Sequence, residues 1–332
     1  MTYTNFAIVV LNWNGINLLK KFLPTVMEHS NDASVYVIDN ASTDNSVNWL
    51  QQNHKEVSII QLKENLGYAG GYQKGLKQID AEFYCLLNSD IEVTENWLQP
   101  IKKLFISNNE IAAIQPKILD YKKTTHFEYA GAGGGFIDKY GYPFCRGRIF
   151  NAIEEDKGQY NDEIPIFWAS GACFFIRSKD YWKVGGLDAD YFAHQEEIDL
   201  CWRLHNSNKK VYYTGKSAVL HVGGASLDYQ SPKKTFLNYR NSLFSIVKNT
   251  KGFQVLWIVF VRMVLDGIAG FQFLAKGQPK NFVAILKAHF SFYANLNSIA
   301  KKRKTIPKQP LNYSVKSIVF NYFIKKQKIW IK

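Results

Sequence analysis

The chain has 332 residues, about twice the length of a typical domain, which favours one large domain with an extension or two domains. Hydrophobic residues make up 46% of the sequence and only 9 residues are prolines, so an intrinsically disordered protein is excluded. The formal net charge of +13 comes entirely from residues 267–332, which hold 13 Lys and Arg and no acidic residue. The balanced remainder excludes a uniformly basic nucleic-acid-binding protein and indicates a neutral body with a cationic end.

The sequence predicts no disulfide scaffold, zinc site, signal peptide or membrane-spanning helix. Its 4 cysteines are scattered, and most stand among apolar neighbours, as buried thiols in a reducing compartment do. The apolar run Phe6–Leu11 is too short for a signal peptide. The most hydrophobic segment, Phe253–Ala275, contains Arg262 and Asp266, whereas a spanning helix needs about 20 apolar residues without such charges.

The first 120 residues alternate short apolar runs with segments of helical periodicity. The apolar runs predict strands at Phe6–Leu11, Val35–Ile38, Val57–Leu62 and Phe83–Leu87. The segments that follow them predict helices at Leu18–Glu28, up to Leu50, at Gly67–Ile79 and at Trp97–Ile106. Such alternation is typical of βαβ units, so we expect an α/β fold with a mostly parallel central sheet.

The pattern changes after these elements. Residues Ala112–Tyr181 hold short apolar runs and glycine-rich turns, which predict a smaller inserted sheet region beside the site. A short helix at Glu197–Asn206 is expected next, followed by two strands at Val211–Thr214 and Val219–Leu220.

The last hundred residues have a different character. The sequence becomes helical beyond Lys233, and Tyr313–Lys332 is amphipathic, with apolar residues at helical spacing and lysines between them. We therefore expect a main domain over residues 1–232 and a basic, helical C-terminal extension over residues 233–332.

Polar residues directly follow three of the predicted strands. Asn12 comes after the first strand, Asp39 after the second, and Asn88-Ser89-Asp90 after the fourth. Because ligands of open parallel sheets bind beyond the carboxyl ends of the strands, these residues define a candidate polar crevice. Each of them alone also fits a turn or a helix cap. The glycine motifs of dinucleotide-binding and P-loop proteins do not follow the first strand.

The residue types at these strand ends suit a metal ion and a nucleotide. An aspartate such as Asp90 favours a hard cation, Mg²⁺ or Mn²⁺, which leaves room for substrate phosphates. Asp39 is placed to accept hydrogen bonds from a nucleobase or a ribose. The glycine-rich segment Asn65–Gly71 precedes a helix and offers backbone N–H groups to an anion.

Seven segments are more specific together than alone. They are VVLNWNG, VIDNASTDNS, ENLGYAGGYQKGL, LLNSDIEV, SGACFFIRS, GGLDADYFAHQEEIDLCWRL and LHVGGAS. In this order, over roughly residues 5–230, they resemble the family 2 glycosyltransferases with the GT-A fold. The similarity is greatest to the rhamnosyltransferase-like branch, which builds bacterial surface polysaccharides.

The resemblance implies roles for the residues of the candidate crevice. Asp39 would hold the nucleotide base, and Asn88-Ser89-Asp90 stands where the family has its Asp-x-Asp metal motif. Because Asn88 replaces the first aspartate, metal ligation should rest mainly on Asp90. His221 matches a position that can complete the metal or diphosphate site, and a structural, hydrogen-bonded histidine is the alternative. The donor-binding site is expected to include Asn12, Asp39, Asn65, Gly71, Asn88 and Arg203.

The family's catalytic base lies in an acidic pair within E-D-x-D-L-C-x-R, and this sequence reads E-E-I-D-L-C-W-R from Glu196 to Arg203. Glu197 is therefore the expected base, and Glu196 is the second candidate because glutamate is one methylene longer than the family's aspartate. Asp199 and Arg203, four residues apart, are also compatible with a simple ion pair on one helix face. For the acidic cluster as a whole, the alternative is a solvated helix start.

These observations predict an inverting transfer of a sugar from a nucleotide-diphosphate sugar to an acceptor hydroxyl, with a divalent cation as cofactor. A glycan or lipid-linked acceptor is expected. The basic C-terminal region favours binding to an anionic membrane surface, so the enzyme is expected in the cytoplasm, on the inner face of the cell membrane. Ordinary packing helices with solvated lysines are the alternative. No stacking motif supports nucleic-acid binding.

Two other classes of protein stay open at this point. A sugar-phosphate nucleotidyltransferase also combines an α/β sheet with metal-binding aspartates, but Asn12-Trp13-Asn14-Gly15 is not the basic glycine-rich loop that such an enzyme would have. A non-catalytic carbohydrate-binding protein would need no acidic pair beside a metal site. The products released from a nucleotide sugar separate these classes.

Overall fold

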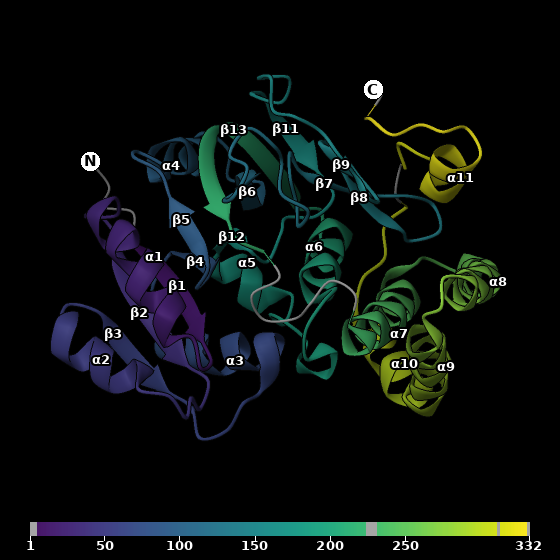
Figure 1. Ribbon diagram of the computed structural model, residues 1–332, viewed down its shortest axis with the longest axis horizontal. Helices are drawn as coiled ribbons and strands as arrows, with labels where there is room; N and C mark the ends of the chain where they lie inside the picture. Colours follow the sequence, from purple (N-terminus) through teal and green to yellow (C-terminus); the bar gives the residue numbers. More distant parts are fainter. Residues whose placement is uncertain (1–4, 224–230, 311–312, 331–332) are drawn as a thin grey trace.

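The computed structural model describes residues 5–223, 231–310 and 313–330. Within these residues a nine-stranded sheet forms the middle of the molecule, in the order β11-β13-β6-β12-β4-β1-β2-β3, with β5 paired to β13 (Figure 1). Its strands are β1 (Phe6–Asn12), β2 (Ser34–Asp39), β3 (Ser58–Gln61), β4 (Phe83–Asn88), β5 (Ile91–Val93), β6 (Ile111–Asp120), β11 (Glu163–Ile166), β12 (Cys173–Arg177) and β13 (Lys210–His221). The helices around it are α1 (Ile16–Glu28), α2 (Ser46–Asn53), α3 (Gly67–Gly75), α4 (Leu98–Ser107), α5 (Ser178–Lys183) and α6 (Glu196–Asn206).

The half of the sheet from β4 to β3 is parallel, as predicted. β1 pairs with β2 and β4, and β2 pairs with β3, all in the parallel sense. Alternate residues of β1 enter two different cores: Ala7 and Val9 face one, while Ile8 and Val10 face the other. Burial on both faces is the reason why this strand has a continuous apolar sequence and no alternation.

The other half of the sheet differs from the prediction in two respects. β6 and β12 belong to the central sheet, although both fall within the stretch expected as an insertion, and β12 runs antiparallel between β4 and β6. The strands predicted at residues 211–214 and 219–220 form a single strand, β13, whose register on β6 shifts between Thr214 and Ala218. The separate antiparallel sheet is therefore smaller than the expected insertion. It consists of β7 (Gly135–Ile137), β8 (Pro143–Cys145), β9 (Arg148–Ile149) and β10 (Ala152–Ile153).

Helices gather at the end of the molecule opposite β3 and α2 (Figure 1). They are α7 (Pro232–Asn249), α8 (Gln254–Ala275), α9 (Pro279–Ala294), α10 (Leu296–Thr305) and α11 (Ile318–Phe323). The amphipathic segment predicted at Tyr313–Lys332 is helical only over α11 within its described part. Ile318 is buried against the small sheet, and Trp330 stacks on Phe136 with ring centroids 4.6 Å apart. The small sheet buries these apolar residues without a long helix.

Candidate active site

The ends of β1 and β2 hold a buried pair of polar side chains. Asn12 and Asp39 are register partners, and Asn12 Nδ2 donates to Asp39 Oδ1 at 3.1 Å and to Ser42 Oγ at 3.1 Å. The other carboxylate oxygen of Asp39 accepts from the backbone N–H of Ser42 at 3.0 Å. Asn12 Oδ1 has no hydrogen-bond partner among the described residues, although it is buried. The Asp39 carboxylate is thus held in one orientation at the carboxyl edge of the sheet.

The glycine-rich segment packs against this edge through Asn40. The Asn40 amide donates to Asn65 Oδ1 and to the carbonyl of Gly67, both at 3.0 Å, and accepts from the N–H of Leu66. Gly67 has φ +70°, and a Cβ there would lie 2.6 Å from the Phe192 ring. A Cβ on Gly71 would lie 2.8 Å from the Leu11 side chain. Asn65 and Gly71, which were predicted as donor contacts, therefore take part in internal packing that brings α3 against the strand ends.

A histidine bridges two carboxylates near the end of β4. Asp90 lies between β4 and β5, and His221 is the last residue of β13. His221 Nε2 is 3.2 Å from Asp90 Oδ1, and its Nδ1 is 3.2 Å from Glu128 Oε2. The Asn88 amide lies 3.5 Å from the same Nε2. Burial alone would lower the pKa of His221, but the hydrogen bonds to Asp90 and Glu128 raise it to about 10.

This arrangement fits a divalent cation only in part. Asp90 offers a carboxylate oxygen beside the imidazole nitrogen of His221, and Glu128 holds the far side of the ring, as outer carboxylates do at metal-bound histidines. A cation at Nε2 would have to displace the proton there. No group of three or more His, Cys, Asp and Glu side chains converges on a cation position in the described parts of the chain. A cation held by Asp90 and His221 would therefore need oxygens from the substrate and from water.

The acidic pair stands at the start of α6, after a strained segment. Phe192, His194 and Gln195 have φ values of 64°, 69° and 72°, in the left-handed region that costs a non-glycine residue about 1–3 kcal/mol. The side chain of Asn241, on α7, holds this segment. Its amide donates to the carbonyls of Tyr191, Ala193 and His194 at 3.0, 3.0 and 2.7 Å. The orientation of the first turn of α6 thus depends on a helix of the C-terminal region.

The two glutamates lack partners and resist ionisation. Glu196 is only 4% exposed, and the Oε2 atoms of both Glu196 and Glu197 are buried without a hydrogen-bond partner among the described residues. Burial, and then the charge of Glu197, raises the pKa of Glu196 well above its usual range. Burial also raises the pKa of Glu197, to about 7, although backbone N–H groups lower it. Near neutral pH one carboxyl group of the pair therefore keeps its proton while the other can accept one.

Tyr68 connects the acidic pair to the strand ends. Burial raises the pKa of its hydroxyl, and Tyr72 and the two glutamates add to the shift, which places Tyr68 beside them. The hydroxyl donates to the carbonyl of Gly171 at 2.6 Å, and the next carbonyl, of Ala172, accepts from the N–H of Asn88.

The three groups of polar residues therefore line the same edge of the sheet. Asn88 is paired with Leu11 of β1, the neighbour of Asn12 in the sequence. From Asn12 the hydrogen bonds continue to Asp39, and from Asn88 the contact continues to His221 and Asp90. The short segment Gly171–Ala172 joins this edge to Tyr68 and the acidic pair.

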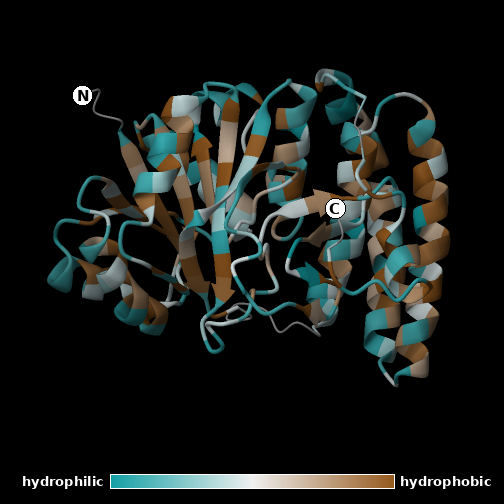
Figure 2. Cartoon of the chain, turned by 90° about the horizontal axis from the view of Figure 1, so that it is seen from above, coloured by the Kyte–Doolittle hydropathy of each residue, from teal (hydrophilic) through white to brown (hydrophobic). Residues whose placement is uncertain are grey.

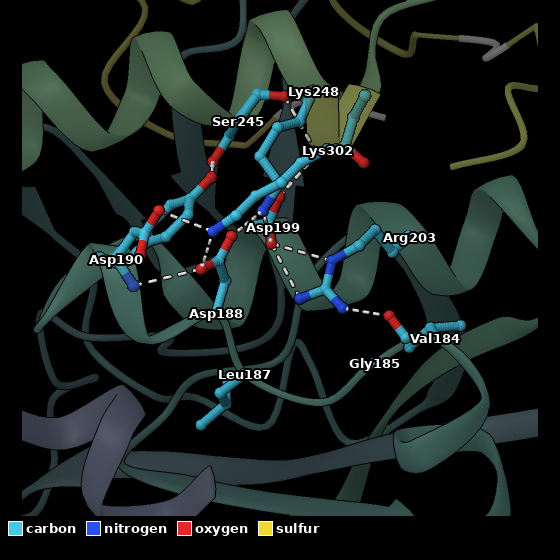
Figure 3. A network of polar contacts seen from close by, with 12 residues as sticks. Val184, Gly185, Leu187, Asp188, Asp190, Asp199, Arg203, Ser245, Lys248 and Lys302 are labelled. Atoms are coloured by element: carbon cyan, nitrogen blue, oxygen red, sulfur yellow. Dashed lines mark hydrogen bonds and ion pairs between the residues drawn. The ribbon is translucent and has the colours of Figure 1, made fainter. Parts of the chain in front are cut away.

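Arg203 and Asp199 lie elsewhere, inside the protein (Figure 3). Asp199 is fully buried, and its Oδ2 accepts from Arg203 Nε at 2.9 Å and from Lys248 Nζ at 2.8 Å. Lys248 also contacts Asp188 at 2.7 Å, and Asp188 contacts Lys302 of α10 at 2.6 Å. The remaining nitrogen of Arg203 donates to the carbonyl of Val184. Arg203, which was predicted among the donor contacts, is thus placed in this network and away from the strand ends.

Several residues of the candidate site were not found from the sequence. Glu128, Tyr68, Asn40 and Asn241 each orient a predicted residue or its backbone. Asn40 and Tyr68 stand inside the quoted motifs, so the motif itself was the available signal. Glu128 and Asn241 lie far along the chain from their partners, and no local pattern marks them.

Comparison with known proteins agrees with this geometry. The sequence model of the family named Glycosyl transferase family 2 matches residues 7–185, more than half of the chain. The low-salt glycan biosynthesis hexosyltransferase Agl10 of Haloferax volcanii is 22% identical over 245 residues, which are 71% of this chain and 74% of that protein. The N-acetylglucosaminyl-diphospho-decaprenol L-rhamnosyltransferase of Mycobacterium tuberculosis is 24% identical over 220 residues, 61% of this chain and 71% of that protein.

Solved structures support the fold. The mannosyltransferase PcManGT of Pyrobaculum calidifontis, in complex with GDP-Man and Mn²⁺, superposes with a TM-score of 0.54 at 10% identity and 88% coverage of both chains. GalNAc-T7 with UDP, GalNAc and Mn²⁺ gives a TM-score of 0.53 at 16% identity, over 65% of this chain and 43% of that one. At these identities the likeness shows the fold alone, which is the GT-A fold. The chain belongs to glycosyltransferase family 2, and it is a GT-A glycosyltransferase with relatives in glycan and polysaccharide synthesis.

Proposed function

We propose that the enzyme transfers a sugar, with inversion at the anomeric carbon, from a nucleotide-diphosphate sugar to an acceptor hydroxyl. One observation carries the proposal. The buried carboxyl groups of Glu196 and Glu197 each have an oxygen without a partner among the described residues, next to the strand ends that hold Asp39 and Asp90. An acceptor hydroxyl between the acidic pair and the donor would supply the missing hydrogen bond.

The donor would lie along the strand ends. Asp39, oriented by Asn12, is placed to accept a hydrogen bond from the nucleotide base, and Asn12 Oδ1 is a second free acceptor. The diphosphate would lie beside Asn88 and Asp90. The complexes of PcManGT with GDP-Man and of GalNAc-T7 with UDP support a nucleotide-sugar donor, although neither identifies the base or the sugar used here.

Proton transfer follows from the unequal acidities of the pair. The acceptor oxygen attacks the anomeric carbon and forms the new glycosidic bond, while the bond to the diphosphate oxygen on the opposite face breaks. Glu197, whose pKa of about 7 leaves much of it ionised at neutral pH, takes the acceptor proton. Glu196 stays protonated and is available to donate a hydrogen bond, since two adjacent buried carboxylates repel each other.

A divalent cation, Mg²⁺ or Mn²⁺, is part of the proposal. Asp90 and His221 would hold it, and when bound it would neutralise the charge that develops on the departing diphosphate. Glu128 would keep the His221 ring in place. The Mn²⁺ in the two neighbouring structures supports this assignment.

Donor hydrolysis tests the reaction class and the cation together. The purified enzyme is incubated with a panel of nucleotide sugars with and without Mn²⁺, and the released nucleotide is identified. We expect cation-dependent release of a nucleoside diphosphate, which Asp90→Ala abolishes together with cation-dependent nucleotide binding in calorimetry. Diphosphate release from a nucleoside triphosphate would instead identify a nucleotidyltransferase. Full nucleotide binding by Asp90→Ala would remove Asp90 from the cation site.

We further propose that the acceptor is a glycan or a lipid-linked intermediate of bacterial surface polysaccharide synthesis. The name of the mycobacterial relative, which refers to a diphospho-decaprenol substrate, supports a lipid-linked acceptor. Residues 1–232 would form the catalytic domain, and the basic region 233–332 would keep the enzyme on the cytoplasmic face of the cell membrane.

A further inference from the structure

Helix α8 has its polar side turned inward. Arg262 and Asp266 are buried, with Arg262 donating to Ser242 Oγ at 2.8 Å and to the Gly141 carbonyl at 3.2 Å. Asp266 accepts from Tyr142 at 3.3 Å and lies 3.2 Å from His289. A surface helix of a water-soluble protein has the opposite arrangement, with its apolar side toward the core.

The solvent side of α8 is lined with large apolar side chains. Those near it and on it that are at least 40% exposed are Phe253, Leu256, Trp257, Phe260, Val264, Ile268, Phe271 and Leu274. They recur every three or four residues and form one continuous stripe along the helix. Figure 2 shows α8 as the outermost helix of the molecule, coloured mostly as hydrophobic.

Helix α9 extends this stripe into a surface. Its exposed apolar side chains are Val283, Leu286, Phe290 and Tyr293, and Phe290 is 73% exposed. The two helices pack together, with Gly270 of α8 against Phe282 of α9. We call these exposed side chains of α8 and α9, together with Phe253, the outer apolar face. It far exceeds the scattered apolar exposure that is normal on a soluble protein.

The surroundings of the outer apolar face are cationic. Exposed lysines stand before α8, after it, at the start of α9 and within the α9 stripe: Lys251, Lys276, Lys280 and Lys287. Asp266, the last acidic residue of the chain, is buried. An apolar surface with an unopposed positive rim is complementary to a bilayer that contains anionic phospholipids.

We propose that the outer apolar face lies in the plane of an anionic phospholipid membrane, with the side chains of α8 and α9 in the boundary between headgroups and acyl chains. This inference deepens the proposed membrane association and rests on it for its biological purpose. It assigns the contact to α8 and α9 instead of the segment Tyr313–Lys332.

Two other occupants agree less well with the structure. By length and composition α8 is the one helix of the described residues that could cross a membrane. Crossing would expose Arg262 and Asp266 to lipid and break their bonds to Ser242 and Tyr142, which is costly. A symmetric dimer through this face would bring the lysines of the two copies together without any acid to pair them.

The proposed contact lies one helix away from the active site. α7 packs against both α8 and α9 on one side and against α6 on the other. It carries Asn241 and Lys248, which bind the segment before the acidic pair and Asp199. A membrane-bound α8–α9 layer would thus hold the catalytic crevice at a fixed height above the lipid surface, where a lipid-linked sugar has to be reached.

Vesicle flotation of the full chain tests the proposal without donor or acceptor. We expect flotation with vesicles of phosphatidylcholine and phosphatidylglycerol, weaker flotation with phosphatidylcholine alone, and a decrease with salt. Phe260→Gln combined with Phe271→Gln should lower the partition coefficient roughly tenfold or more. Both side chains are exposed, so the fold should survive. The matched control is Ile106→Gln on α4, where Ile106 is 64% exposed and outside the face.

Two further measurements separate the occupants. Trp257 fluorescence should be quenched by lipids with brominated acyl chains, and Trp257→Phe should remove that component. Extraction with alkaline carbonate should release the protein, because nothing spans the bilayer. The proposal fails if the protein resists extraction, if the double variant binds vesicles like the control, or if the face instead mediates a dimer that the double variant dissociates. These outcomes are independent of donor hydrolysis, so a failed contact and a failed reaction are distinguishable.

Discussion

The first turns of α6 hold two kinds of buried carboxyl group only a few residues apart. Asp199 is completely partnered, by Arg203, Lys248 and Asn249, and although burial would raise its pKa, these cations lower it. Glu196 and Glu197 have buried oxygens without partners, and burial raises their pKa values. The same helix thus shows that burial alone does not decide what a carboxyl group does. A partnered charge stabilises the fold, whereas an unpartnered one is available for proton transfer.

The largest expected effect tests the unpartnered side of this comparison. Glu197→Gln removes the base while keeping the size of the side chain, so the turnover of sugar transfer should fall by about 10²–10⁴. Nucleotide binding, measured by calorimetry, should be unchanged because Asp39 and Asp90 remain. Wild-type turnover in this variant would move the base to Glu196 or to another group.

A second variant tests the partnered side. Lys248→Met leaves the negative charges of Asp188 and Asp199 buried with one partner fewer, so the free energy of unfolding should fall by about 3–5 kcal/mol. Denaturant unfolding of the purified variant measures it. The control is Lys216→Met, whose partner Glu163 is near the surface and whose loss should cost about 0–1 kcal/mol. Equal effects of the two substitutions would contradict a structural role for the buried network.

The pH dependence of transfer gives a third test. A general base acts in its unprotonated form, and the pKa of Glu197 is raised to about 7. The turnover rate should therefore rise with pH through about 7 and fall about tenfold per unit below it. The residual rate of Glu197→Gln should lack this step. A wild-type rate that stays level between pH 5 and 8, roughly the range around that pKa, would exclude a base of this kind.

The smallest effect is expected at the other member of the pair. Glu196 keeps its proton because burial and the charge of Glu197 raise its pKa, and glutamine resembles a protonated glutamate in shape. Glu196→Gln should therefore change turnover by no more than about threefold to tenfold, far less than a lost base. Parallel single-turnover measurements of the two variants rank them, and a reversed ranking would exchange their roles.

Much of the fold was predictable because its local signals agree. The continuous apolar runs of β1 and β4 and the helical spacing of α1 each specify one element, and the residues that follow them mark the carboxyl edge. The extent of the insertion was overestimated because β6 and β12 pair with distant strands that no local window contains. The amphipathic spacing of Tyr313–Lys332 was equally ambiguous, since a small sheet buries part of it without a long helix.

The candidate site was predictable where chemistry and sequence position coincide. Asp39, Asp90 and the acidic pair all stand in motifs whose order is recognisable. Arg203 illustrates the limit: its spacing from Asp199 fits either a ligand contact or an ion pair, and only the position of Lys248 and Val184 shows that its guanidinium is engaged inside the protein.

By itself the sequence determined the alternation of strands and helices, the family and the concentration of positive charge after residue 266, because these depend on residue types and their spacing. The tertiary structure decided which side of each element faces inward. Arg262 and Asp266 interrupt an apolar segment in the sequence, but in space they point into the protein and leave α8 apolar outside. Glu128 and Asn241 likewise reach His221 and the segment before α6 only after folding, since long-range pairing depends on packing and periodicity carries no information about it.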